Sequence, residues 1–576
     1  MKRISKITGL CLLVALICSV TLFSACSNGL AVVEVPDEVG WRLFNMDSAK
    51  DDVNVIFFDD DNVVSKDGTS YTRNTITSSQ HSIKSSDCYM IKSGDCEILV
   101  DAGQQMPQVH EIKIREIDSR LVNEYLKKDV QTNLLRKIAT VMSDDGVLDY
   151  LIVTHADYDH IAALIVEGGV FDAFLESKTI VDFNNRSVKF KRINNIIDFD
   201  SGLVRNYSDE KIEKNKRLIT SGVYQAYVTQ RDALIKQSKD NGYETKYCPA
   251  AALFEDVKPN KVDEAFMPDN VIKKLKKSTD NNPAADKGFY ILDESTQSAN
   301  GLSDKARLNA SFDKDKLLAS AKGKLVKAKG GKSRYYYSLA FNNGELRILY
   351  NWHYNYIYHG SFGNESAQNA NNISVCFEVV KDKFKFLSLG DLGGNGENAL
   401  LKYYGKTDVL KNVSLYKPSH HGSINNDENS SNLFKKIKPR IIAITGCAQV
   451  KPVALDIVTN VMLSTTKVDK RFFDNVDDVY GKNKPYVLCT NINTYTFDSN
   501  YHSNYHFYSL PFYGDIKVRF DGRKMYLSYS YAGQVKGYVK QDVDQRAFTT
   551  RDGENKFLSV YQTKWFKQIK KHIWES

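Results

Sequence analysis

The stretch LDYLIVTHADYDH, residues 148–160, places a cluster of potential metal ligands directly behind a short apolar run that predicts a buried strand. The ligands are His155, Asp157, Asp159 and His160. Carboxylates as close as Asp157 and Asp159 repel each other unless cations neutralise them. A solvated polar loop would explain one or two of these residues, but not all of them at the end of a strand. Since imidazole and carboxylate ligands suit zinc, manganese or iron, the stretch predicts a metal-binding loop.

Two later stretches add candidate ligands, again at the ends of apolar runs. Asp391 follows the run at residues 384–390, where its carboxylate could bridge two metal ions. The pair His420-His421 follows the run at residues 413–417. Either feature alone is also compatible with a surface turn. Their order behind the first cluster favours one binuclear site.

Five motifs in this order resemble the metallo-β-lactamase superfamily, and more closely the extracytoplasmic domain of the ComEC family of competence DNA-uptake proteins. They are Asp101-Ala-Gly103, Thr154 to Ile161, Asn371 to Ser374, Gly390-Asp-Leu392 and His420-His-Gly-Ser423. The resemblance covers residues 53–175 and 335–530 and lacks that family's channel segments. It implies an α/β fold, a metallo-β-lactamase αββα sandwich, with a long, mainly helical insertion.

The resemblance also implies a role for each ligand around two divalent metal ions, zinc or manganese. His155 and Asp157 would hold one ion, Asp159 and His160 the other, with Asp391 as the bridge and His420 or His421 completing the second site. Asp157 stands where the family often has histidine, and this hard oxygen ligand favours manganese or magnesium over an all-imidazole zinc site. Asp159 or Asp391 could act as the general base.

Residues around these ligands are implied to orient the loop or contact substrate. Asp101 would orient the ligand loop through hydrogen bonds. A further superfamily histidine could correspond to His353 or His359, or Asn372 could occupy that side. Ser423 belongs to the last motif, and Lys451 stands where the family has a histidine and could bind an anionic group.

The N-terminus predicts export and lipid anchoring. Lys2, Arg3 and Lys6 precede an apolar run at residues 7–23, which is typical of a signal peptide. The sequence Leu-Phe-Ser-Ala-Cys26 that follows resembles a bacterial lipoprotein cleavage box, with Phe at a position where smaller residues are commoner. Cys26 would then carry the lipid and anchor the chain on the outer face of a membrane. A plain secretory signal is the alternative.

Composition and patterning divide the rest of the chain. We expect a signal peptide at 1–25, a tether at 26–52, the two halves of the hydrolase fold at 53–175 and 336–530, an insertion at 176–335 and an extension at 531–576. With 42% hydrophobic and 26% charged residues, the chain is typical of a globular protein. Its formal charge of +8 is compatible with an anionic substrate.

These features predict a binuclear metal-dependent hydrolase at the cell surface, a phosphodiesterase acting on nucleic acid. The same site could act on a wall polymer such as teichoic acid, or on another ester or a lactone. A different class is a surface binding lipoprotein with little catalysis, for which the only support is the long polar region 176–335. Clustered carboxylates argue against that class, because they are costly unless they bind cations.

Overall fold

The computed structural model describes sixteen segments of the chain. They are residues 30–35, 43–44, 46, 51–59, 62–64, 70–72, 87–103, 132–199, 222–254, 314–330, 333–351, 370–423, 428–445, 485–495, 507–511 and 514–530.

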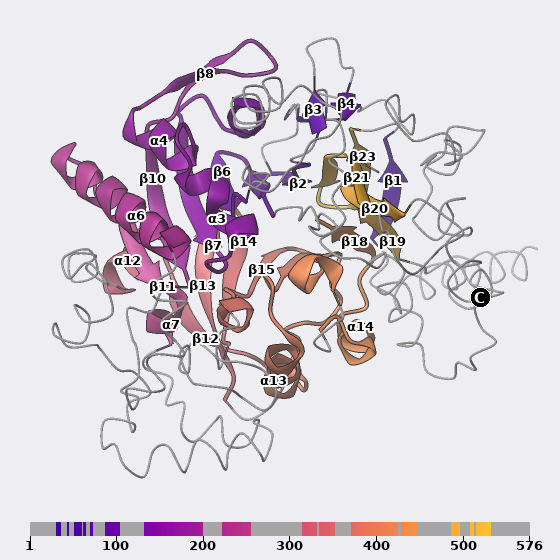
Figure 1. Cartoon of the computed structure of the whole chain (residues 1–576). Coiled ribbons are helices and arrows are strands. Elements are labelled where there is room, and N and C mark those ends of the chain that lie inside the picture. Colours follow the sequence, from indigo (N-terminus) through magenta and orange to yellow (C-terminus); the bar gives the residue numbers. More distant parts are fainter. Residues whose placement is uncertain are drawn as a thin grey trace, which may run out of the picture.

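Two large sheets form the centre of the molecule (Figure 1). The first has the order β1 (Ala31–Glu34), β23 (Lys524–Tyr529), β22 (Ile516–Phe520), β2 (Val53–Phe57), β5 (Tyr89–Ser93), β6 (Cys96–Val100), β7 (Val147–Val153), β10 (Arg192–Asp198) and β11 (Lys246–Pro249). The second has the order β12 (Lys324–Lys327), β13 (Tyr335–Phe341), β14 (Gly344–Leu349), β15 (Phe377–Lys381), β16 (Phe384–Ser388), β17 (Leu415–Lys417), β18 (Ile441–Ile444) and β19 (Tyr486–Cys489). Three two-stranded ribbons are β3 (Asn62–Val64) with β4 (Ser70–Thr72), β8 (Thr179–Val181) with β9 (Ser187–Lys189), and β20 (Asn491–Tyr495) with β21 (Phe507–Pro511).

The two sheets pack against each other through aromatic side chains. Phe386 of the second sheet contacts Phe57 and Tyr89 of the first, with ring centroids 6.0 and 5.8 Å apart. The Tyr89 hydroxyl donates to Ser388 Oγ across the same interface, at 2.7 Å. β5 and β16 are buried along nearly their whole length, although each contains a lysine and a serine.

Helices cover the outer faces, so the layers are helix, sheet, sheet, helix, as predicted (Figure 1). On the side of the first sheet lie α3 (Tyr158–Ile165), α4 (Val170–Leu175), α6 (Gly222–Asp240) and the helical residues 132–141. On the side of the second sheet lie α13 (Gly394–Tyr404) and α14 (Ser431–Ile437). The shorter helices are α7 (Ala250–Leu253) and α12 (Lys314–Ser320). No helix within the described residues is long and apolar enough to cross a membrane.

The region 176–335, expected to be a mainly helical insertion, also contributes strands. β10 pairs in parallel with β7, and β11 pairs in parallel with β10, so both extend the first sheet. The prediction missed β10 because two asparagines interrupt its apolar pattern in RINNIID. Helix α6 agrees with the helical character expected of this region, whereas the short helix α12 ends at Ser320 and is followed by β12.

Both sheets contain a parallel portion, and this arrangement positions the site. In the first sheet β6 and β7 are parallel neighbours, and in the second β16, β17 and β18 are. The carboxyl ends of parallel strands meet at one edge of a sheet. The chain leaves these ends at Asp101, Thr154, Leu389, Pro418 and Thr445, and every candidate ligand in the described residues lies at or just beyond one of these positions.

Candidate metal centre

The loop after β7 is fixed by one carboxylate from the neighbouring strand. Asp101 has a left-handed backbone, φ 51°, which turns its side chain under the loop. Its two oxygens accept from the backbone N–H and the hydroxyl of Thr154, both at 2.7 Å, and Oδ2 lies 2.8 Å from Nδ1 of His160. Contacts of this kind orient a ligand loop, in agreement with the role expected of Asp101.

Asp157 begins α3 but does not use its side chain as a helix cap. A carboxylate at this position ordinarily accepts from a backbone N–H of the first turn. The side chain of Asp157 makes no such bond, remains 46% exposed and lies with Oδ2 3.7 Å from Nε2 of His155. Asp157 therefore does not cap α3 with its side chain, and its carboxylate lies beside His155 instead.

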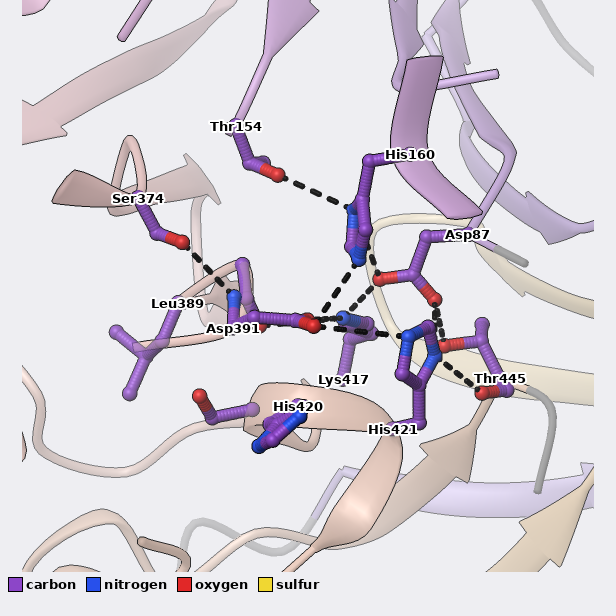
Figure 2. A network of polar contacts seen from close by, with 12 residues as sticks. Asp87, Thr154, His160, Ser374, Leu389, Asp391, Lys417, His420, His421 and Thr445 are labelled. Carbon is purple, nitrogen blue, oxygen red and sulfur yellow. Dashed lines mark hydrogen bonds and ion pairs between the residues drawn. The ribbon is translucent and has the colours of Figure 1, made fainter. Parts of the chain in front are cut away.

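Carboxylate Oδ2 of Asp391 lies close to Nε2 of three histidines, two of which, His160 and His421, are seen in Figure 2. It is 3.1 Å from Nε2 of His160, 3.5 Å from Nε2 of His421 and 3.8 Å from Nε2 of His155. Asp159 joins the group from α3, with Oδ2 3.4 Å from Nε2 of His421. His155 follows β7 of the first sheet, whereas Asp391 and His421 follow β16 and β17 of the second. The site therefore lies where the two sheets meet.

The separations match those of atoms that share a cation. Ligand atoms held tetrahedrally at about 2.0–2.1 Å from zinc lie about 3.3–3.4 Å apart. The five separations around His155, His160 and His421 run from 3.1 to 3.8 Å, and four of them exceed an ordinary hydrogen bond. The buried Nε2 atoms of all three histidines lack a hydrogen-bond partner within the described structure. Because a buried polar atom without a partner is costly, these residues fit metal ions.

The Nδ1 atoms of two of these histidines have partners that set the tautomer. In His160 Nδ1 faces Asp101, and in His421 Nδ1 lies 3.1 Å from the carbonyl oxygen of Thr445. A proton on Nδ1 leaves Nε2 as a lone-pair donor toward the site.

The electrostatics show how much negative charge is gathered here. Burial opposes the charged form of His421, yet Asp391 and Asp87 raise the pKa of its imidazole to about 10. Burial would raise the pKa of the Asp391 carboxyl, but His160 and His421 hold it well below its ordinary value. The carboxylates around His160 and His421 thus raise the pKa of both imidazoles and favour positive charge at this position, as expected where carboxylates are in excess.

Counting formal charges gives the number of cations that would balance the cluster. The three histidines contact five carboxylates, and one buried ammonium, that of Lys417, contacts two of them, which leaves a net charge of −4. The carboxylates are Asp87, Asp101, Asp157, Asp159 and Asp391. Two divalent ions would neutralise this charge. Imidazole with carboxylate suits zinc or manganese.

The structure distinguishes between the two adjacent histidines that the sequence left open. His421 is buried and belongs to the converging group. His420 lies with its ring centroid 6.3 Å from that of His421, and its Nδ1 contacts Oε1 of Glu428 at 2.9 Å. Figure 2 shows His420 set apart from the contacts around Asp391. The geometry favours His421 as the ligand.

The remaining expected residues fall into two groups. Asn372 accepts at Oδ1 from the backbone N–H of Gly393, 3.2 Å away, so it braces the turn after Asp391. Ser423 is buried at the end of the histidine loop, and its carbonyl accepts from Asn429. The residues His353, His359, Lys451 and Cys26 lie outside the described residues.

Sequence reasoning missed Asp87 and Lys417, both fully buried beside the ligands. Lys417 forms an ion pair with Asp87, and Asp87 Oδ1 lies 3.2 Å from Nδ1 of His421. Neither residue carries a local signal, because Asp87 is an isolated acid before β5 and Lys417 resembles a strand-end surface charge. Each becomes recognisable only when strands from the two sheets meet.

Comparisons with known proteins find likeness only among solved structures. No protein-family model matches the chain, and the search of curated proteins finds no match. Among solved structures, the chain is similar to the crystal structure of the metallo-beta-lactamase fold protein YhfI from Bacillus subtilis. The identity is 10%, the match covers 68% of this chain and 85% of that chain, and the TM-score is 0.22. A superposition this loose has no bearing on function, which has to be inferred from the sheet topology and the ligand geometry.

Proposed function

We propose that this chain is a binuclear metal-dependent hydrolase of the metallo-β-lactamase type that cleaves phosphodiesters outside the cell. The observation that carries the proposal is the convergence of His155, His160 and His421 on Asp391, each with a buried Nε2 that has no hydrogen-bond partner in the described structure. His155, Asp157 and Asp391 would hold one ion. Asp159, His160, His421 and Asp391 would hold the other.

Two divalent cations, when bound, make water more acidic and stabilise the negative charge that develops during ester hydrolysis. The protein's own residues would supply orientation and a proton acceptor. Asp391 directs Oδ2 to three imidazoles and Oδ1 to Lys417, so both of its oxygens are engaged. Within the described residues Asp159 forms one ion pair, between Oδ2 and Nε2 of His421, which makes it the better placed carboxylate to take a proton from water.

Support for a phosphodiester comes from the ComEC-like motif order and from the basic chain, whose formal charge is +8. Nucleic acid is the leading substrate class, and a teichoic-acid-type wall polymer is the alternative with the same chemistry. A carboxylic ester or a lactone is the third candidate for the same pair of metal ions. The opposing hypothesis, a binding lipoprotein with little catalysis, does not account for three buried Nε2 atoms that lack a hydrogen-bond partner in the described structure.

The test combines metal analysis with turnover on residues 27–576, the chain without its leader and its lipid-bearing Cys26. We expect about two equivalents of manganese or zinc per chain and hydrolysis of bis-p-nitrophenyl phosphate. Asp159→Ala and Asp391→Ala should each lose turnover. The matched control is Asp240→Ala, an exposed carboxylate that pairs only with Lys236 on the surface of α6. A folded chain that binds no metal and has no activity would overturn the proposal, and metal without phosphodiester turnover would favour the ester or lactone candidates.

We further propose that lipid on Cys26 anchors the enzyme to the outer face of a membrane. The signal-like leader and the cysteine box support this localisation. Cys26→Ser should move the protein from the membrane fraction to the medium and abolish incorporation of labelled palmitate. Retention of the variant on membranes would contradict the lipid anchor without affecting the hydrolase proposal.

A further inference from the structure

One fully buried lysine lies behind the metal centre. Lys417 is the last residue of β17, and its side chain has no exposed surface. Its ammonium pairs with Asp87, lies 3.6 Å from Oδ1 of Asp391 and donates to the carbonyl oxygen of Gly390 at 3.2 Å. Burying an ammonium is costly unless it is paired and hydrogen-bonded, so this position requires a reason.

The partner carboxylate contacts the two histidines from behind. Asp87 Oδ1 lies 3.2 Å from Nδ1 of His421, and Oδ2 lies 3.7 Å from Nδ1 of His160. Thr445 donates its hydroxyl to the same carboxylate. Asp87 therefore faces the ring nitrogens that point away from the site, while the Nε2 atoms of both rings face Asp391.

We propose that Lys417 and Asp87 form a positioning pair that fixes three metal ligands at once: His160, His421 and Asp391. The proposal rests on the metal centre described above. Lys417 restrains Asp391 through Oδ1, which leaves Oδ2 directed at the imidazoles. Asp87 contacts both imidazoles at Nδ1, the side that sets ring orientation and tautomer.

The location of the pair explains why a lysine is used here. Asp87, His160 and His421 could themselves hold a cation, since their ligand atoms lie within 4.8 Å of one another. The Lys417 ammonium already pairs with Asp87 and supplies a fixed positive charge at that carboxylate. The arrangement keeps Asp87 ionised without a third metal ion, and it leaves Asp391 free to bridge the other two.

A second buried pair in the same chain provides a matched control. Lys137, in the helical residues 132–141, lies 2.7 Å from Oδ1 of Asp515, and both side chains are at most 2% exposed. Lys137 also donates to the carbonyl oxygen of Asp59. This pair touches none of the metal ligands, so its loss reports the stability cost of breaking a buried lysine–aspartate pair alone.

The experiment compares Lys417→Met, Asp87→Asn and the double variant with Lys137→Met, all in the full mature chain. Dissociation constants for Mn²⁺ and Zn²⁺ are measured by competition with a fluorescent chelator, and melting temperatures are measured on metal-free protein. We expect both single variants at the centre to weaken cation binding about 10- to 100-fold, the range typical of residues that orient metal ligands. Lys137→Met should lower the melting temperature and leave both dissociation constants unchanged.

The double variant separates positioning from a structural role. It removes both members of the ion pair and keeps the net charge of the cluster at the wild-type value, so its metal-free melting temperature should recover toward that of the wild type. Cation binding should stay weak, because Asp391 and the two imidazoles remain unrestrained. Recovery of both properties would overturn the proposal, as would a wild-type dissociation constant in either single variant. If Lys417→Met does not fold, Asp87→Asn gives the same reading. Wild-type protein that binds no cation would instead refute the metal centre itself.

Discussion

The two loops that build the metal centre differ in how they are held. The loop at residues 154–160, from the first sheet, presents four candidate ligands and is fixed largely by one residue, Asp101, through three contacts. The loop at residues 419–423, from the second sheet, contributes one converging ligand, His421, and depends on residues scattered along the chain. A ligand-dense loop can be recognised from its own sequence, whereas a loop with one ligand owes its geometry to distant partners.

The backbone of the second loop shows how strong that dependence is. His420, His421 and Gly422 have φ values of 48°, 51° and 85°, in the left-handed region that only glycine enters without cost. Asn429 stabilises the turn by accepting from the Ser419 N–H and donating to the carbonyl oxygens of Ser419 and Ser423. The surrounding structure therefore overcomes an intrinsic preference at two histidines in succession.

The largest expected effect comes from replacing the two adjacent histidines with alanine, one at a time. His421→Ala removes a converging Nε2, so we expect loss of one equivalent of bound metal and a fall in turnover greater than the 10- to 100-fold effects typical of orienting residues. His420→Ala is the matched variant, because it has the same left-handed backbone but pairs with Glu428. Elemental analysis should find two metal ions in it. Equal metal loss in both variants would mean that the loop, and not the His421 side chain, makes the site.

The sequence predicts the ligand-dense loop at 154–160 better than the loop at 419–423. The loop at 154–160 and Asp391 are predictable because ligands and apolar runs adjoin one another in the sequence. The choice between His420 and His421 is not, since it depends on the left-handed turn and on Asn429. Strand β10 was missed because its burial comes from the sheet around it and not from its own apolar pattern.

A smaller effect is expected from Asp101→Asn, which tests the single support of the first loop. The change keeps the side chain's size and suits its left-handed backbone. Its amide would accept from the Thr154 N–H but present N–H groups to Nδ1 of His160, which shifts that proton to Nε2 and blocks the lone pair facing the site. We expect cation binding to weaken about 10- to 100-fold, measured by chelator competition. Unchanged binding would show that Asp101 serves only to shape the turn.

Asn429→Ala should have a milder effect on binding, because several contacts share the support of the second loop. The change removes four hydrogen bonds, to Tyr416, Ser419 and Ser423, each contributing about 1 kcal/mol. We expect the free energy of unfolding to fall by about 2–4 kcal/mol in denaturant titrations, and cation binding to weaken less than in Asp101→Asn. Asn185→Ala is the control, since Asn185 also has positive φ, 62°, but is exposed in the turn between β8 and β9. Equal losses in the two variants would assign the effect to the backbone alone.

The smallest expected effect concerns a buried carboxyl behind the second loop, that of Glu397. Glu397 of α13 accepts from the backbone N–H and the hydroxyl of Ser430, next to Asn429. Burial raises the pKa of its carboxyl to about 7, with the charge of Glu428 adding to the shift and the hydrogen bonds from Ser430 opposing it.

Since the pKa of Glu397 is higher in the folded chain than in the unfolded one, its contribution to stability is complete below about pH 4.5 and is lost as pH rises through about 7. We expect the free energy of unfolding of metal-free wild type to fall more steeply between pH 5 and 8 than that of Glu397→Gln. The difference between the two curves isolates this group from the histidines of the centre. If the free energy of unfolding falls with the same slope in wild type and Glu397→Gln, ionising Glu397 costs no folding free energy. The support of the second loop would then come from its hydrogen bonds alone.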